Sequence, residues 1–293
     1  MAVKPFSKEQ LNFFKFSSII LDEFPKAVRH IFVTLWDSKI AVLPGYQVWD
    51  DSTAVRNMLL KREGGKTGIP INQSIGEWDC TALFQATIYA KTFGSLSGKG
   101  PTKTLNDLYL KKKKPAAVLF HPSVNSPTGN RDETYALAID QIRLLRNKLC
   151  HSAKSEIVKA DFDQFVQLAK DALTAAKLST TSIDGIGGLT EDDFPTEKVT
   201  KLNELVQEEL QSMNRFLQDN MKETTSGIDE RTREIKETTS GIDQTTREIK
   251  ETTSDIDKKM KDMICDMHKL MRTSGEPTHT ICKDSTPGKN DTN

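Results

Sequence analysis

Cysteine is scarce in this 293-residue sequence, and the few cysteines present are not grouped. Cys80, Cys150, Cys265 and Cys282 form no C-x-x-C pair, so neither a zinc ribbon nor a dithiol redox motif is present. The histidines also lack partners at metal-ligand spacing, and we predict no metal site. Scattered, unpaired cysteines are typical of a reducing compartment, so we expect a cytoplasmic protein.

Long apolar runs and alternating apolar and polar residues are absent as well. The N-terminus, MAVKPFSKEQ, has no signal-peptide core, and no stretch approaches the roughly 18 apolar residues of a membrane span. Gly65-Lys66-Thr67 resembles the end of a P-loop, but Leu60 stands where the first glycine is required. We therefore expect no membrane segment, no strands and no bound cofactor.

The neutral overall charge hides two parts of opposite sign. Residues 1–190 hold 25 Lys and Arg against 18 Asp and Glu, a net charge of +7. Residues 191–293 hold 16 against 23, a net charge of −7. The basic part can attract a polyanion such as RNA and the acidic part cannot, so the charge permits RNA binding without demonstrating it.

Helical spacing of apolar residues dominates the first 178 residues. Pro25 stands where a second helix would begin its first turn, so two packed helices are expected before residue 40. Ser52 or Asp51 can cap a third helix, and Asp79 a fourth. The expected helices cover residues 8–24, 24–36, 52–63, 78–93, 131–154 and 162–177, the last capped by Asp161.

The predicted fold class is all-α, a helical bundle followed by an extended C-terminal coiled-coil helix. We place the helical domain at residues 1–178 and a flexible linker at 179–196, where Gly185, Gly187, Gly188 and Pro195 occur. A coiled-coil helix is expected at 197–272 and a disordered tail at 273–293.

A fourteen-residue repeat marks the C-terminal part. GIDERTREIKETTS at residue 227 returns as GIDQTTREIKETTS at 241, which is a period of two heptads. Isoleucine fits position d and threonine or methionine position a. Threonine in the seam, together with Gly227 and Gly241, predicts a weak coiled coil, and the oligomer number stays open. The d residues are Ile228, Ile235, Ile242, Ile249, Ile256 and Met263, and the a residues are Thr232, Thr239, Thr246, Thr253, Met260 and Met267.

The stretch from Arg143 to His151 has a cationic face. On a helix, Arg143, Arg146, Asn147 and His151 fall on one side. The opposite side carries apolar residues, which we expect to face a core: Tyr135, Ala138, Ile142, Leu145 and Leu149. The cationic face is suited to gripping a phosphate.

Arg146-Asn147, followed after three residues by His151, resembles the R-x4–6-H signature of HEPN domains. The order of LDEFPKAVRHIF, LPGYQVWD, Glu77-Trp78-Asp79 and IRLLRNKLCHS is similar to the HEPN subfamily of the RING ubiquitin ligase called DAZ-interacting zinc-finger protein. The resemblance covers about residues 10–177. The cysteines of a RING finger are absent, so ubiquitin transfer is not implied.

Active HEPN domains are metal-independent ribonucleases that work as dimers, and the resemblance implies roles for these residues. His151 would act as general base or acid, Arg146 would stabilise charge on the phosphate, and Asn147 would orient the imidazole. Alternatively the same residues bind phosphate without cleavage, form a structural face, or complement the dipole at a helix end. The run Lys111, Lys112, Lys113 and Lys114 either contacts RNA phosphates, as Arg143 would, or is a solvated helix end.

The expected function is therefore a self-associating HEPN-type interaction module that binds RNA, with metal-independent endoribonuclease activity left open. A non-catalytic protein adaptor in intracellular signalling of the innate-immune kind is the alternative. The expected partners are further copies of the chain, RNA and other signalling proteins.

Overall fold

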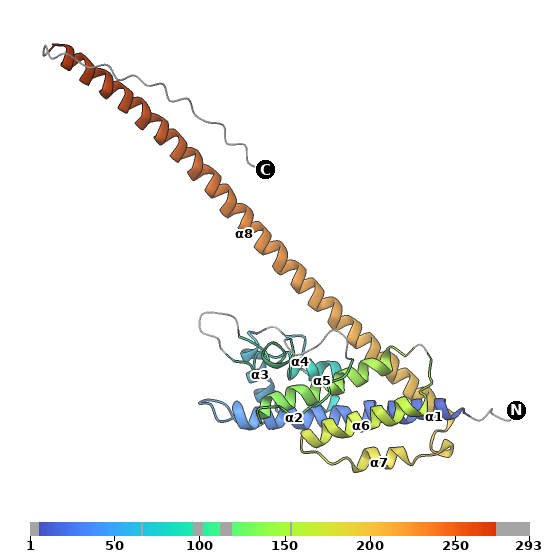
Figure 1. Cartoon of the computed structure of the whole chain (residues 1–293). Coiled ribbons are helices and arrows are strands. Elements are labelled where there is room, and N and C mark those ends of the chain that lie inside the picture. Colours follow the sequence, from blue (N-terminus) through green and yellow to red (C-terminus); the bar gives the residue numbers. More distant parts are fainter. Residues whose placement is uncertain (1–5, 66, 96–101, 112–118, 153, 274–293) are drawn as a thin grey trace. The chain divides into compact units, whose positions relative to one another are not determined.

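Helices joined by loops make up the part of the chain described in a computed structural model, which comprises residues 6–65, 67–95, 102–111, 119–152 and 154–273 (Figure 1). Within these residues no strand forms beyond a single bridge between Ser95 and Lys103. The predicted all-α class and the long C-terminal helix are confirmed. The helices are α1 (Lys8–Ser18), α2 (Phe24–Lys39), α3 (Thr53–Arg62), α4 (Cys80–Ala86), α5 (Arg131–Cys150), α6 (Lys159–Ala175), α7 (Thr181–Gly187) and α8 (Thr196–Thr273).

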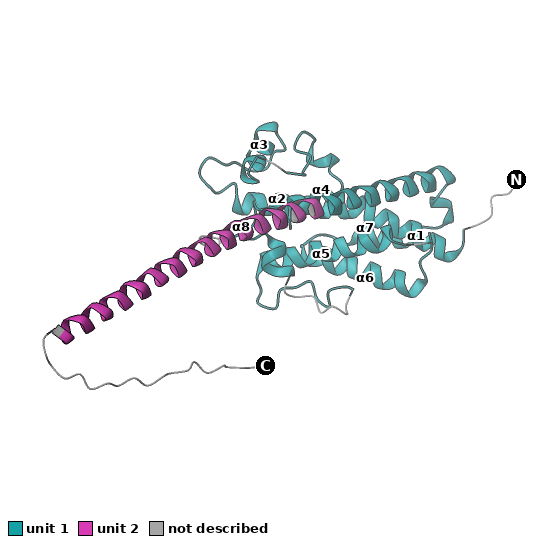
Figure 2. Cartoon of the chain, turned by 90° about the horizontal axis from the view of Figure 1, so that it is seen from above, with its two compact units in different colours: residues 1–220 teal, residues 221–293 magenta. Residues whose placement is uncertain are grey.

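Two compact units divide the chain, residues Met1–Asn220 and Met221–Asn293 (Figure 2). The first unit contains α1 to α7 and the beginning of α8, and the rest of α8 forms the described part of the second unit. The first unit thus ends well beyond residue 178, where the sequence pattern placed the end of the domain.

The two helices expected before residue 40 are joined without a turn. A π-helical segment, Ile19–Glu23, connects α1 directly to α2, and the Phe24 N–H donates to the carbonyl of Ile19. Proline lacks an N–H, and its ring crowds the carbonyl four residues before it. The π turn before Pro25 accommodates the missing N–H and the bulk of the proline ring, so the chain continues as one helical rod.

The core of the first unit is built around α5. This helix packs against α6, α2 and α4, and α6 also packs against α1. Figure 1 shows α6 running beside α5 and α1. An aromatic cluster closes one end, where the ring of Phe32 lies within 6.3 Å of four others, those of Trp36, Trp49, Trp78 and Phe93.

The segment expected to be a flexible linker, residues 179–196, is folded onto the core instead. It contains α7, and both Ile183 and Phe194 are buried. The Nζ of Lys15 donates to the carbonyl of Gly187 at 2.9 Å. Two buried apolar side chains outweigh the glycines that favoured a linker. Residues 274–293, which include nearly all of the expected disordered tail, lie outside the described residues.

Candidate functional site

Helix α5 carries the predicted site residues and is well defined at both ends. The Asn130 side chain caps it by accepting from the N–H groups of Asp132 and Glu133. At the other end, the His151 N–H donates to the carbonyl of Asn147 at 3.0 Å. The face expected to be apolar is buried, as all five of its members show: Tyr135, Ala138, Ile142, Leu145 and Leu149.

Arg143, Arg146 and Asn147 of α5 and the C-cap residue His151 lie around one cavity of about 100 Å³. Its other walls come from α4, from Tyr89 and from a part of α8 that we call the clasp segment, residues 202–217. Within the first unit, the clasp segment therefore covers the part of the cationic face that carries Arg146. The lining residues are Thr81, Phe84, Tyr89, Arg143, Arg146, Asn147, His151, Met213, Phe216 and Leu217.

Arg146 is buried, with 2% of its surface exposed. Its Nη2 donates to the Thr81 hydroxyl at 3.2 Å, and its guanidinium lies 5.2 Å from the centroid of the Phe84 ring. Its Nε lies 3.8 Å from Oε2 of Glu209 in the clasp segment. Among the described residues, Nε and Nη1 have no hydrogen-bond partner. An RNA phosphate therefore has no path to this guanidinium while the clasp segment stays in place.

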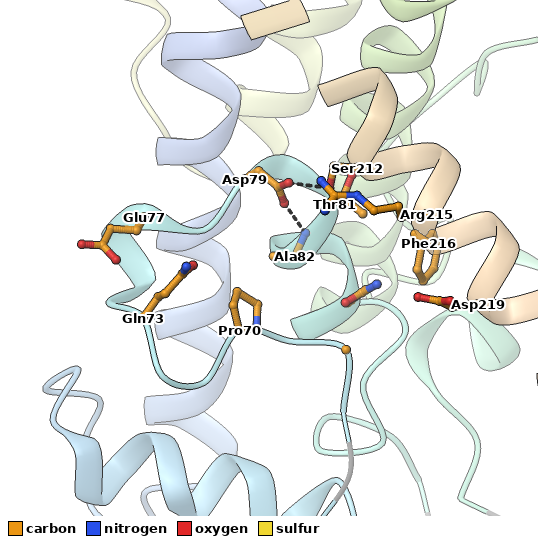
Figure 3. A pocket seen from close by; sticks show the side chains of 12 residues that line it. Pro70, Gln73, Glu77, Asp79, Thr81, Ala82, Ser212, Arg215, Phe216 and Asp219 are labelled. Atoms are coloured by element: carbon orange, nitrogen blue, oxygen red, sulfur yellow. Dashed lines mark hydrogen bonds between the residues drawn. The ribbon is translucent and has the colours of Figure 1, made fainter. Parts of the chain in front are cut away.

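The clasp segment is fastened to the start of α4 by two side chains. Glu209 accepts a hydrogen bond from the Cys80 N–H at 2.9 Å, and the Ser212 hydroxyl donates to Oδ2 of Asp79 at 2.5 Å. Asp79 caps α4, as expected, by accepting from the Ala82 N–H. Figure 3 shows Asp79 reaching both partners. The Cys80 N–H, one of the orphan groups at the α4 N-terminus, and the Asp79 carboxylate thus hold α8 in position.

His151 and Asn147 do not form the side-chain pair that the resemblance implies. His151 is exposed at the end of α5, and Oδ1 of Asn147 is buried without a partner among the described residues. Arg143 is paired, because its Nη2 lies 2.6 Å from Oδ1 of Asp140. Oδ2 of Asp140 lies 2.6 Å from Nε2 of buried His121.

Burial sets the protonation of the groups near Arg146. It raises the pKa of Glu209, although the positive charge of Arg146 opposes this. Burial also raises the pKa of Cys150 to about 11 and that of Cys80 well above its usual range. Both thiols are therefore protonated and unreactive at neutral pH.

Of the four lysines at positions 111–114, the structure describes only Lys111. Lys111 is exposed and paired with Asp107, its Nζ lying 2.5 Å from Oδ1. Lys112, Lys113 and Lys114 lie outside the described residues. In the described parts of the chain, no group of three His, Cys, Asp or Glu side chains is placed to hold a metal ion, and no helix is long and apolar enough to cross a membrane.

Glu209 and Thr81 are the contacts of Arg146 that sequence reasoning missed. The signal for Glu209 lies in the spacing of the buried residues Leu202, Val206, Glu209 and Met213, which share one helical stripe. A carboxylate inside an apolar stripe indicates a buried cation opposite. Thr81 leaves no comparable signal in the sequence.

The comparisons with known proteins add no relative. No protein-family model, no curated protein and no solved structure matches this chain. The resemblance to HEPN domains therefore stays a prediction.

Proposed function

We propose that this protein is a self-associating interaction module, in which the second unit joins copies of the chain and the helical first unit recognises RNA or a protein partner. The row of exposed apolar side chains along α8 carries the proposal. A cytoplasmic location is part of it, since Cys80, Cys150 and Cys265 are free thiols, as a reducing compartment requires.

The five isoleucines of the heptad series all point to solvent in the single chain. Their exposed fractions lie between 57% and 67%. A regular row of exposed apolar side chains on a helix favours association, because burying one isoleucine side chain stabilises the associated state by about 1.5–3 kcal/mol. A second copy offers a matching row. The residues are Ile228, Ile235, Ile242, Ile249 and Ile256.

The threonines at position a can be buried at a helix interface because their hydroxyl groups are already hydrogen-bonded. Each hydroxyl donates at 2.8 Å to the backbone carbonyl four residues earlier, which belongs to the isoleucine preceding it. A threonine bonded in this way can turn its methyl group to a partner without leaving a buried hydroxyl unpaired. The four are Thr232, Thr239, Thr246 and Thr253.

Substitutions in the seam test the proposal. We expect Ile242→Asp with Ile249→Asp to convert an oligomer into a monomer, as measured by analytical ultracentrifugation of the full chain. Ser240→Asp with Ser254→Asp is the matched control, because it places the same charges on the same helix away from the seam. A wild-type protein that is monomeric at 100 μM would contradict the proposal.

Metal-independent RNA cleavage is the second candidate function. It is favoured by the convergence of Arg143, Arg146, Asn147 and His151 on one cavity. It is opposed by the burial of Arg146 against Glu209, so cleavage would require the clasp segment to move away.

The test of this second function is RNA incubation in EDTA. Cleavage by the wild type that is lost in both Arg146→Ala and His151→Ala, yet kept in Lys148→Ala, would support it. Lys148 is an exposed cation of the same helix and serves as control. Ser212→Ala loosens the clasp segment. If RNA stays intact with the wild type and with this variant, cleavage is excluded and the adaptor or RNA-binding function remains.

A further inference from the structure

A second, larger cavity lies in the first unit, away from the Arg146 cavity. It measures about 760 Å³ and is formed by the ends of α2 and α3, by the loop around residues 91–95 and by residues 102–109. Such a volume is in the range of cavities that hold small organic ligands. We call it the basic cleft, and its lining residues are Lys39, Tyr46, Lys61, Arg62, Lys91, Phe93, Gly94, Ser95, Thr102, Leu105, Leu108, Tyr109 and Asp132.

Positive charge dominates the basic cleft. Asp132 is the one carboxylate among its described lining residues, and it already forms an ion pair with Lys39. Within the described residues, no carboxylate lies within 4 Å of the cationic groups of Lys61, Arg62 or Lys91. Three uncompensated cations facing one cavity favour an anionic ligand.

The carboxylate of Glu63, the residue after Arg62, binds backbone groups of the loop. Its two oxygens accept from the N–H groups of Lys91, at 3.1 Å, and of Thr92, at 2.8 Å. It therefore fixes the loop to the end of α3 and is not among the lining residues of the cleft. This contact fixes the backbone at Lys91 to the end of α3, which carries Lys61 and Arg62.

Close backbone contact fixes the other side of the loop. Ser95 and Lys103 exchange two backbone hydrogen bonds of 2.9 and 3.0 Å. A Cβ atom on Gly94 would lie 2.2 Å from the carbonyl oxygen of Lys103, so only glycine permits this approach. The cleft is therefore a built feature, with cations positioned by fixed backbone.

The side chain of Arg62 has an unused hydrogen-bond donor at the cleft. Its guanidinium lies 5.3 Å from the centroid of the Tyr46 ring, and its Nε is buried without a hydrogen-bond partner among the described residues. A buried donor without a partner is rare and calls for an acceptor. Arginine and lysine together are the usual recognition groups for phosphate.

From this geometry we propose that the basic cleft binds a small phosphorylated molecule of nucleotide size, with its phosphates against Lys61, Arg62 and Lys91. The half-buried rings of Tyr46 and Tyr109 supply flat apolar surface for a base or another ring. The cavity of Figure 3 offers a contrast, since its described lining residues include the carboxylates of Glu77, Asp79 and Asp219 and, as a cation, Arg215 alone.

Calorimetric titration of the full-length protein with ADP and with inorganic pyrophosphate tests the proposal. We expect both probes to bind, and Lys61→Glu and Lys91→Glu each to weaken binding about tenfold or more. Both lysines are exposed, so these variants should fold normally. Lys159→Glu, an equal charge change at an exposed site on α6, is the control and should bind like the wild type.

The two probes separate the parts of the ligand. Tighter binding of ADP than of pyrophosphate supports a contribution of the rings, and equal binding supports recognition through phosphate. Absence of binding by both probes at 1 mM, or binding that Lys61→Glu and Lys91→Glu leave unchanged, overturns the proposal. Retention of single-stranded RNA that both variants abolish, without binding of either small probe, also overturns it and assigns the surface to RNA.

Discussion

The Nε atom of Arg146 lies 3.8 Å from Oε2 of Glu209, and both atoms are buried without a hydrogen-bond partner among the described residues. This separation is too long for a hydrogen bond, so the two groups attract each other only through their charges. Such a pair costs desolvation without the compensation of a bidentate contact. The clasp segment is thus fixed to α5 by a contact that opens more easily than an ideal ion pair.

The first prediction concerns Glu209. We expect Glu209→Ala to lower the free energy of unfolding of the first unit by about 3 kcal/mol, because a buried arginine loses its counter-charge and the Cys80 N–H loses its acceptor. Urea unfolding followed by tryptophan fluorescence measures this, since Trp36, Trp49 and Trp78 all lie in the first unit.

The control for this measurement is Glu208→Ala. Glu208 is the exposed neighbour on the same helix, and we expect its removal to change stability by less than about 0.5 kcal/mol. Equal effects of the two substitutions would mean that the buried pair does not hold the clasp segment.

The second prediction uses the thiol of Cys150, whose pKa is raised to about 11 by burial. An ordinary thiol reaches full ionisation above its pKa of about 8.5, whereas Cys150 continues to gain reactivity up to about pH 11. At pH 8 we expect iodoacetamide to alkylate exposed Cys265 and to leave Cys150 nearly untouched. Peptide mass spectrometry measures each site separately.

Opening of the clasp segment should reverse this protection. In Glu209→Ala with Ser212→Ala, we expect Cys150 to be alkylated at least tenfold faster while the rate at Cys265 is unchanged. A wild-type Cys150 that reacts as fast as Cys265 would contradict the burial on which the argument depends.

The sequence predicts the two faces of α5 well but not what covers the second one. The spacing of Ile142, Leu145 and Leu149 is enough to identify the core side, because a single helix determines it. Whether Arg146 faces water or protein depends on α8, which begins fifty residues later in the chain. The stripe that holds Glu209 indicates that α8 buries one face, but it does not specify α5 as the surface that this face covers. The cationic face was predicted, and the burial of Arg146 within it was not.

Local rules also failed where tertiary packing outweighed them. Gly185, Gly187 and Gly188 favour a linker, but Ile183 and Phe194 find places in the core and hold the segment there. Pro25 favours a break, but the π turn before it lets α1 and α2 continue as one rod. In the first case the burial of apolar residues decided the structure, and in the second the π-helical turn did.

The third prediction concerns two glycines inside α8. A Cβ atom on Gly227 or Gly241 would meet nothing within 4 Å, so alanine fits both positions. We expect each change to stabilise the helix by about 0.8–1 kcal/mol and to raise its thermal midpoint in circular dichroism. Gly94→Ala is the opposing case and should destabilise, because its Cβ would collide with the Lys103 carbonyl. A lower midpoint for Gly227→Ala would contradict a continuous helix.

The residues beside the isoleucine seam indicate how two copies of α8 would pair under the proposed self-association. The e positions alternate in sign, whereas most g positions are neutral threonines. In a parallel pair e faces g, which places Arg231 against Lys236 and forms no attractive pair between charged groups at these positions. In an antiparallel pair e faces e, and a register that sets Ile228 opposite Met267 joins Asp243 to Lys250 and Lys236 to Asp257. The e residues are Asp229, Lys236, Asp243, Lys250 and Asp257.

The last prediction is therefore an antiparallel pair, and exposed Cys265 supplies the probe. In the full chain with Cys282→Ser, a spin label on Cys265 should lie about 50 Å from its copy, because residue 230 of the partner stands opposite and 35 residues of helix separate the two. A parallel pair would bring the labels to about 20 Å. Mixing this protein with one labelled at Glu230→Cys in a Cys265→Ser background should give a short distance only in the antiparallel case. A short distance between two Cys265 labels would rule out the antiparallel arrangement while leaving self-association intact.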